Sequence, residues 1–192
     1  MRVIGGRLKG RNLATPTSRD IRPTADRLRE SLFNILMHAY GDPVSDARVL
    51  DLFAGTGALG IEAASRGAKF VLFVDNGAEA RALLRANVEA LGLGGTTKVY
   101  RRDAANLGPA HPVEPFGLVF VDPPYRMQLA EKALVSLRDG GWLVPGALVI
   151  VEEAKDAAFA APDGFTERER RAYDDTEFTI LEFGASPSID PA

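Results

Sequence analysis

An apolar run of the chain stops at two consecutive prolines, and this stop limits what the surrounding segment can form. Leu118–Val121 is followed by Asp122-Pro123-Pro124-Tyr125. Neither proline has a backbone N–H, so a central strand cannot continue through them and the chain must turn. We therefore expect Asp122 and Tyr125 on a stiff loop at the carboxyl end of a buried strand. In open α/β sheets, ligands bind at that edge.

The residues of this loop suit a planar amine. The Asp122 carboxylate and the Pro123 carbonyl are neighbouring acceptors that can take both hydrogens of an exocyclic amine on a nucleobase. The Tyr125 ring can stack on that base, a contact that contributes about 1–3 kcal/mol per base in nucleic-acid sites. A plain turn is the alternative explanation, because Asp and Pro are both common in turns.

A glycine-rich loop follows a second apolar run. Arg48–Phe53 is expected to form a buried strand, and Ala54–Gly60 leads from it into a helix that ends near Arg66. The glycines satisfy G-x-G-x-x-G, a pattern that lets a ligand approach backbone N–H groups at a helix start. Asp51 precedes this loop, and its negative charge disfavours a pyrophosphate and favours a cationic amine.

Two further acids follow the next expected strands. Asp75 comes directly after Phe70–Val74 and twenty positions after Gly55, where a carboxylate can accept hydrogen bonds from both ribose hydroxyls of an adenosine. Asp103 follows Lys98–Arg101 and can accept from the amino group of an adenine. A helix N-cap is the alternative role for Asp103.

The other segments complete an alternation of strands and helices. The expected helices are 24–40, 78–91 and 128–137, and the remaining strands are 116–121, 147–152, 168–173 and 177–183, the last two joined by Asp174-Asp175. This order predicts an α/β protein with a sheet of about seven strands, mostly parallel, that ends in a C-terminal antiparallel hairpin. Arg29 falls outside the apolar stripe of its helix, Asn87 is expected at the polar surface, and Trp142 is expected in the core.

The net charge of the chain is −3, but basic and acidic side chains are unevenly distributed along the sequence. Residues 1–30 carry eight basic and three acidic side chains, a balance of +5, and the remaining fifteen basic and twenty-three acidic side chains sum to −8. A basic end on an acidic body predicts contact with a polyanion. The residues expected to contact RNA phosphates from an N-terminal arm, residues 1–20, are Arg2, Arg7, Lys9, Arg11 and Arg19. Short strands are expected at 2–4 and 12–14, and a mobile arm is the alternative.

Composition narrows the remaining possibilities. The chain has no cysteine, which excludes disulfides and thiolate metal sites, and its two histidines do not have a metal-binding spacing. We therefore expect no metal. No run of 18 apolar residues occurs, so we expect a cytoplasmic protein that does not bind a membrane.

Taken together, these motifs resemble those of class I S-adenosylmethionine-dependent methyltransferases. Asp122-Pro123-Pro124-Tyr125 matches the D/N-P-P-Y/F signature of enzymes that methylate exocyclic amines of nucleobases. Over nearly the whole chain the sequence resembles the bacterial RsmD-type 16S rRNA guanine-N(2)-methyltransferases. The other segments that carry this resemblance are Ile4–Gly6, Arg22–Thr24 with Asp26-Arg27, Glu30–Asn34 and Asp51–Gly60. From Arg168 onward only the pattern matches.

The resemblance implies a single Rossmann-like class I methyltransferase domain over residues 21–184, with a flexible tail at 185–192. It implies S-adenosyl-L-methionine as methyl donor, S-adenosyl-L-homocysteine as product and the exocyclic 2-amino group of a guanine in 16S rRNA as acceptor. The substrate would be either protein-free 16S rRNA or 16S rRNA within an assembling small ribosomal subunit. The enzyme would be a monomer.

The resemblance also implies which residues form the site. Those expected to hold the donor are Arg22, Thr24, Asp51, Phe53, Ala54, Gly55, Gly57, Asp75, Asp103 and Ala104. Those expected in the catalytic loop are Asp122, Pro123, Pro124 and Tyr125. Related enzymes often carry Glu at the position of Asp75, a shorter carboxylate that could still reach the ribose.

Three other functions are compatible with parts of the sequence. DNA or RNA adenine and cytosine amino methyltransferases share the D-P-P-Y signature, but this chain has no room for a DNA target-recognition domain. An NAD-binding oxidoreductase would share the glycine loop and Asp75, yet it leaves D-P-P-Y unexplained. The third alternative is a catalytically silent RNA-binding module. Such a module would not need the donor-site residues or the Asp122-Pro123-Pro124-Tyr125 loop, and the sequence has both.

Overall fold

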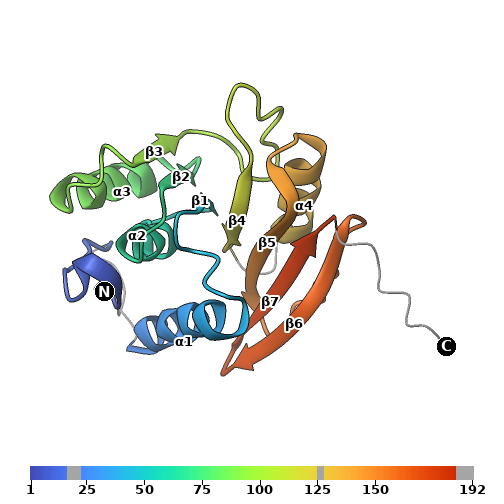
Figure 1. Ribbon diagram of the computed structural model, residues 1–192, viewed down its shortest axis with the longest axis horizontal. Helices are drawn as coiled ribbons and strands as arrows, with labels where there is room; N and C mark the ends of the chain where they lie inside the picture. The colour runs from blue at the N-terminus through green and yellow to red at the C-terminus, as the bar shows by residue number, and fades with distance from the viewer. Residues whose placement is uncertain (17–22, 125–127, 185–192) are drawn as a thin grey trace. The chain divides into compact units, whose positions relative to one another are not determined.

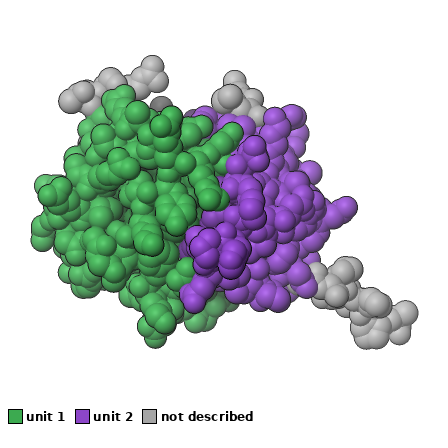
Figure 2. Space-filling view, turned by 90° about the horizontal axis from the view of Figure 1, so that it is seen from above, with its two compact units in different colours: residues 1–104 green, residues 105–192 purple. Residues whose placement is uncertain are grey.

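The structure is a computed structural model that describes residues 1–16, 23–124 and 128–184. The chain divides into two compact units, residues 1–104 and 105–192, coloured separately in Figure 2. The boundaries expected after residues 20 and 184 remain predictions, because residues 17–22 and the expected tail at 185–192 lie outside the described residues.

Strands and helices alternate in the first unit (Figure 1). Its elements are the 3-10 turn η1 (Gly6–Leu8), α1 (Pro23–Ala39), β1 (Arg48–Leu52), α2 (Ala58–Ser65), β2 (Phe70–Val74), α3 (Ala78–Ala90) and β3 (Thr97–Tyr100). The strands are parallel in the order β3-β2-β1, with Val71 paired to both Val49 and Thr97. Parallel strands end at a common edge, so the loops that follow β1, β2 and β3 leave the sheet on one side.

The second unit contains the rest of the sheet strands. Its elements are β4 (Phe116–Val121), α4 (Leu129–Asp139), β5 (Leu143–Ala154), β6 (Phe165–Tyr173) and β7 (Thr176–Phe183). The strand order is β4-β5-β7-β6, with β4 and β5 parallel and the other two pairs antiparallel. Among the described residues there are thus seven strands, mostly parallel, with a C-terminal antiparallel hairpin, as predicted. The expected core residue Trp142 is fully buried, and its Nε1 donates to the Gly108 carbonyl at 2.8 Å.

Some expected boundaries were wrong. β5 begins at Leu143 rather than 147, because Pro145-Gly146 forms an irregularity inside the strand instead of a turn before it. The pairing register jumps there from Phe116 with Leu143 to Leu118 with Leu148. Bulges of this kind accommodate Pro and Gly within a sheet. β6 begins at 165 rather than 168, α4 spans 129–139 rather than 128–137, and the two arm strands reduce to one bridge between Arg2 and Asn12.

A buried carboxylate on α2 anchors the N-terminal arm. Glu62 is 1% exposed and accepts the backbone N–H of Ile4 at 2.8 Å and of Gly5 at 2.7 Å. Its carboxylate also lies 2.8 Å from Nε of Arg66 and 3.6 Å from Nε of Arg29. Arg29 is therefore buried, against the sequence-based expectation. A charged side chain can be buried when opposite charges meet it, and helical periodicity does not reveal those partners.

The arm is also joined to α2 and α3 at two further points. The Leu8 N–H donates to Oγ of Ser65 at 2.9 Å, and the Ala14 N–H donates to Oδ1 of Asn87 at 2.7 Å. Asn87 is buried, which contradicts the expected surface position. Residues 1–16 thus form an ordered segment beside α2 (Figure 1), contrary to the alternative of a mobile arm.

Replacing Glu62 by Gln should uncouple this arm. Glu62→Gln removes the charge that compensates Arg29 and Arg66, and breaking a buried ion pair in this way costs about 3–5 kcal/mol. We expect the free energy of unfolding, measured by urea titration, to fall by about that amount. Glu167→Gln is the matched control, because it loses an exposed pair with Arg170 at 2.8 Å that should contribute less than about 1 kcal/mol. Equal losses in both variants would contradict the anchoring role.

Candidate functional site

The loop between β1 and α2 has an unusual backbone. Phe53, Gly55 and Gly57 all lie in the left-handed region, with φ of 57°, 54° and 81°. Backbone hydrogen bonds that hold the loop include those from Ala54 N–H to the Val74 carbonyl at 3.1 Å and from Gly57 N–H to the Ala54 carbonyl at 2.7 Å. A residue such as Phe53 in this region costs about 1–3 kcal/mol, and strain of this kind concentrates at ligand sites.

The three glycines of the motif have different roles. A Cβ atom at Gly60 would lie 2.3 Å from the Phe73 ring, so packing requires this glycine. A Cβ atom at Gly57 would lie 2.3 Å from Cδ1 of Leu84, and its φ of 81° also favours glycine. A Cβ at Gly55 would meet nothing nearer than the Phe53 carbonyl at 3.9 Å. The backbone at Gly55 is therefore open to the approach of a ligand.

Asp75 is held in place by the glycine loop itself. At the end of β2, its Oδ2 accepts the Gly55 N–H at 2.9 Å and its Oδ1 accepts the Gly77 N–H at 2.7 Å. The side chain is half-buried. A carboxylate has about four lone-pair sites, so each Asp75 oxygen retains capacity for a second donor such as a hydroxyl.

Asp51 lies buried beneath the same loop. It is 1% exposed, and its Oδ2 accepts the Gly60 N–H at 2.9 Å. Burial raises the pKa of Asp51 from 3.8 to about 8; the Gly60 hydrogen bond opposes this rise, and the negative charge of Asp75 adds to it. A cation placed nearby would favour the ionised form. The site is thus suited to a positively charged group.

Asp103 and Ala104 follow the end of β3. Asp103 is exposed and Ala104 is buried. No helix begins within 101–115, all of which the structure describes, so Asp103 does not serve as a helix N-cap. The residues that lie at or after the carboxyl ends of the parallel strands β1, β2 and β3 are Asp51, Phe53, Ala54, Gly55, Gly57, Asp75, Asp103 and Ala104. Thr24 lies in the first turn of α1, and Arg22 lies outside the described residues.

Asn87 belongs to this site, although sequence analysis placed it at the surface. Its Nδ2 donates to the Thr56 carbonyl at 3.0 Å and to the Ala14 carbonyl at 3.1 Å. One side-chain amide therefore connects the glycine loop to the N-terminal arm. The available signal was position, because Asn87 falls three residues after Leu84 and directly before Val88, within the buried face of α3.

The second unit carries the Asp-Pro-Pro loop. β4 ends at Val121, and Asp122, half-buried, begins the segment without regular structure that contains the buried Pro123 and the exposed Pro124. The predicted strand stop is confirmed. Tyr125 lies outside the described residues.

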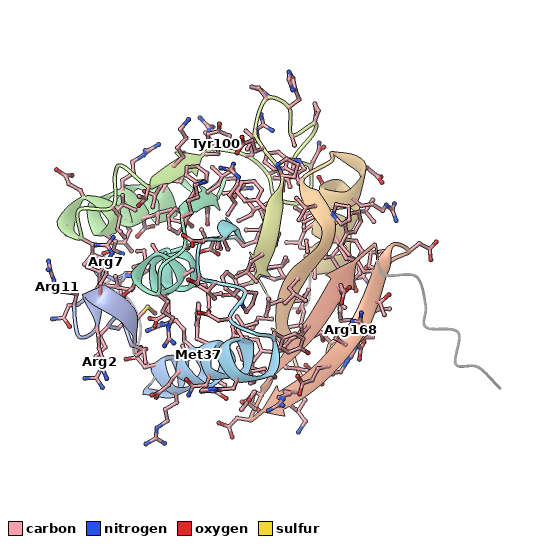
Figure 3. All side chains as sticks on the ribbon, in the orientation of Figure 1. Arg2, Arg7, Arg11, Met37, Tyr100 and Arg168 are labelled. Carbon is pink, nitrogen blue, oxygen red and sulfur yellow. The ribbon has the colours of Figure 1, made fainter. Side chains whose placement is uncertain are left out.

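Four of the five expected RNA-contacting residues are described. Arg7, Lys9 and Arg11 are exposed, and the Arg2 side chain is 67% exposed. Figure 3 shows the arginines around the arm. Arg11 donates to the Ala90 carbonyl at 3.1 Å, which ties the end of the arm to α3. Arg19 lies outside the described residues.

The described residues show neither a metal-binding cluster nor a membrane-spanning helix. Within 1–16, 23–124 and 128–184, no His, Asp and Glu side chains form a group of three or more that could hold a metal ion. Over the same ranges, none of the helices combines the length and hydropathy that a membrane crossing requires.

The chain was compared with known families and structures. A family model described as conserved hypothetical protein 95 matches residues 1–182. The ribosomal RNA small subunit methyltransferase D of Escherichia coli is 41% identical over 152 residues, or 79% of this chain and 74% of the relative. The enzyme of the same name from Haemophilus influenzae is 36% identical over 168 residues, or 86% and 85% of the two chains.

A solved structure agrees with these matches. An Escherichia coli protein, described provisionally as a methyltransferase, superposes with a TM-score of 0.80 at 33% identity and covers 97% of this chain and 99% of its own. The fold is that of a Rossmann-like methyltransferase. The chain belongs to the family of ribosomal RNA small subunit methyltransferase D.

The buried acid at the glycine loop should give the protein a characteristic pH dependence. Between pH 4 and 8, folded Asp51 retains a proton that the unfolded chain releases, so the free energy of unfolding should fall as pH rises through this range. The slope for one such group reaches about 1.4 kcal/mol per pH unit and disappears above about pH 8. Asp51→Asn should remove this component. Urea titrations at pH 5.5, 6.5 and 7.5 measure the difference between the two proteins.

A difference between wild type and Asp51→Asn that does not change over this pH range would show that Asp51 is already ionised. Asp163→Asn, at an exposed position of the second unit, is the matched control. It should keep the wild-type slope.

Proposed function

We propose that this chain transfers a methyl group from S-adenosyl-L-methionine to the exocyclic 2-amino group of a guanine in 16S ribosomal RNA. The Asp122-Pro123 pair at the end of β4 carries the proposal, because it offers two adjacent acceptors in a chain whose relatives are named small subunit ribosomal RNA methyltransferases. The substrate is bacterial 16S rRNA, free or within an assembling small subunit.

The first unit fits the proposed donor. Asp51 offers a buried carboxyl that a cation would ionise, and Gly55 leaves open space over its backbone. Asp75 is preset to accept from the ribose hydroxyls, because two backbone N–H groups hold its carboxylate. Asp103 and Ala104 would contact the adenine, and Arg22 with Thr24 would cover the donor. When bound, S-adenosylmethionine supplies an electrophilic methyl group on a sulfonium, and S-adenosylhomocysteine is its product.

The Asp-Pro-Pro loop would activate the amine. The lone pair of a guanine 2-amino group is delocalised into the ring, which makes the nitrogen a poor nucleophile. Hydrogen bonds from this amine to the Asp122 carboxylate and the Pro123 carbonyl draw the nitrogen toward tetrahedral geometry and localise the pair. The same acceptors stabilise the positive charge that develops on the nitrogen. Because the prolines stiffen the loop, the orientation is set before the reaction.

Tyr125 would hold the base for this reaction. Enzymes that act on a base must take it out of its stack, and an aromatic ring replaces the lost stacking. The arm would hold the RNA itself, since Arg2, Arg7, Lys9 and Arg11 present exposed charges for phosphates on a segment whose backbone is ordered.

Loss of the carboxylate at position 122 should abolish methyl transfer. Asp122→Ala removes an acceptor aimed at the developing charge, and we expect kcat/KM on 16S rRNA to fall at least about 100-fold. Affinity for S-adenosylhomocysteine, measured by calorimetry, should stay within about twofold of wild type. Asp163→Ala, an exposed change in the same unit, should leave both quantities unchanged. Normal turnover of Asp122→Ala would refute the proposed grip on the amine.

Reversing charge on the arm should weaken RNA binding and reduce its dependence on salt. The triple variant Arg7→Glu, Lys9→Glu, Arg11→Glu loses three phosphate contacts, so the slope of log K against log salt should become shallower by about 2. Filter binding at several salt concentrations measures this slope. Lys69→Glu, Lys132→Glu, Arg168→Glu makes the same change of net charge elsewhere on exposed surface and should change the slope much less. Equal slopes for both triples would exclude the arm from the binding surface.

A further inference from the structure

The second unit has a cavity near its catalytic loop. The cavity has a volume of about 400 Å³. It is lined by Gln128, which precedes α4, Glu131 from α4, Glu153 from β5, and Asp156, Ala157, Ala158 and Phe159 from the segment after β5. This size lies within the range of small-ligand pockets. Three of its side chains are carboxylic acids, and they come from three different segments of the chain.

One of these acids is buried without a partner for one of its oxygens. Glu153 is 6% exposed, and among the described residues nothing donates a hydrogen bond to its Oε2. Burial raises the pKa of Glu153, and the negative charge of Glu131 raises it further. An unsatisfied buried acceptor destabilises a protein by about 1–3 kcal/mol, and more when it is charged. A ligand that donated a hydrogen bond to this oxygen would remove that cost.

The ligand that supplies the donor is not a metal ion. The carboxylates around the cavity do not form a group of three that could hold a metal, among the residues that the structure describes. The negative lining also repels a phosphate. An N–H group would supply the missing donor, and a flat molecule would suit the apolar wall that Ala157, Ala158 and Phe159 provide beside the acids.

The position of the cavity relates it to the Asp-Pro-Pro loop. β4 and β5 are parallel, and Val121 pairs with Val151, so Asp122 directly follows β4 beside the carboxyl-terminal part of β5, in which Glu153 lies. Gln128, which lines the cavity, is the residue that precedes α4 and lies only four positions after Pro124. Gln128 is thus the first described residue after the loop to which we assign the amine.

We infer that this cavity receives the target base and that Glu153 selects guanine by accepting a hydrogen bond from its N1–H. This inference rests on the proposed function, in which Asp122 and Pro123 accept the two hydrogens of the 2-amino group. Guanine presents the N1–H donor beside that amine. Adenine carries an acceptor at N1, and cytosine carries one at N3, so either base would place a lone pair against the carboxylate. Glu153 is therefore a specificity residue, in addition to the catalytic loop.

A base analogue tests this role directly. 2,6-Diaminopurine keeps the 2-amino group that accepts methyl but has an acceptor at N1. We would map the modified guanine by mass spectrometry of methylated rRNA and then place guanine or 2,6-diaminopurine at that position of the RNA by ligation. Wild-type protein should transfer methyl to the guanine RNA at least about 10-fold faster in kcat/KM, since a site built to accept from a donor rejects an analogue that lacks it.

Substitution of Glu153 should remove this preference. In Glu153→Gln the amide N–H₂ can donate to N1 of the analogue, so the guanine preference should fall to near one or reverse. Glu177→Gln is the matched control, because Glu177 pairs with Glu153 across β5 and β7, has Arg170 at 3.0 Å and does not line the cavity. It should keep the wild-type preference. Affinity for S-adenosylhomocysteine reports whether each variant is folded.

Different results would contradict guanine selection by Glu153 and the proposed methyl transfer. Equal transfer to the two RNAs by wild-type protein, or a wild-type guanine preference in Glu153→Gln, would overturn the inference and leave the proposed function in place. Absence of transfer to any guanine RNA by wild-type protein would overturn the proposed function itself. The wild-type comparison of the two RNAs decides the question even if Glu153→Gln does not fold.

Discussion

A single buried carboxylate, that of Glu62, joins segments that are far apart in the sequence of the first unit. It accepts two backbone N–H groups of the N-terminal arm and pairs with arginines from α1 and α2. Because α2 begins at the glycine loop, the arm, α1 and the proposed donor site share one support. Removal of this charge would leave Arg29 with Asp26 as its remaining acidic partner and would break the ion pair of Arg66 with Glu62, so it would destabilise all three segments.

Features set by short stretches of sequence could be predicted well. Apolar runs and proline stops are local, so β2 and β4 have the expected bounds, and Asp75 and Asp122 follow the strands that they were expected to follow. Burial of polar groups was predicted poorly, because it depends on partners distant in sequence. Arg29 and Asn87 are buried by contacts with Glu62 and with the arm. The sequence does not reveal these partners, although the position of Asn87 on the buried face of α3 indicated its burial. The start of β5 was missed because Pro145-Gly146 resembles a turn.

The site residues show the same division. The motif G-x-G-x-x-G predicted a loop at a helix start, but only the structure separates Gly55, which leaves space for a ligand, from Gly57 and Gly60, which allow close packing. Sequence indicated that Asp51 suits a cation. Its raised pKa follows from complete burial, which a linear pattern does not measure.

The side-chain amide of Asn87 has a consequence for how the two ends of the first unit communicate. It holds the Thr56 carbonyl of the glycine loop and both backbone groups of Ala14 at the base of the arm. A displacement of Ala14 therefore acts on the loop through one rigid group, with no intervening hinge. The coupling free energy between the arm and the loop is the same in both directions. A polyanion that stabilises the arm would therefore raise the affinity of the loop for a small molecule, and the small molecule would raise the affinity of the arm for the polyanion by the same factor.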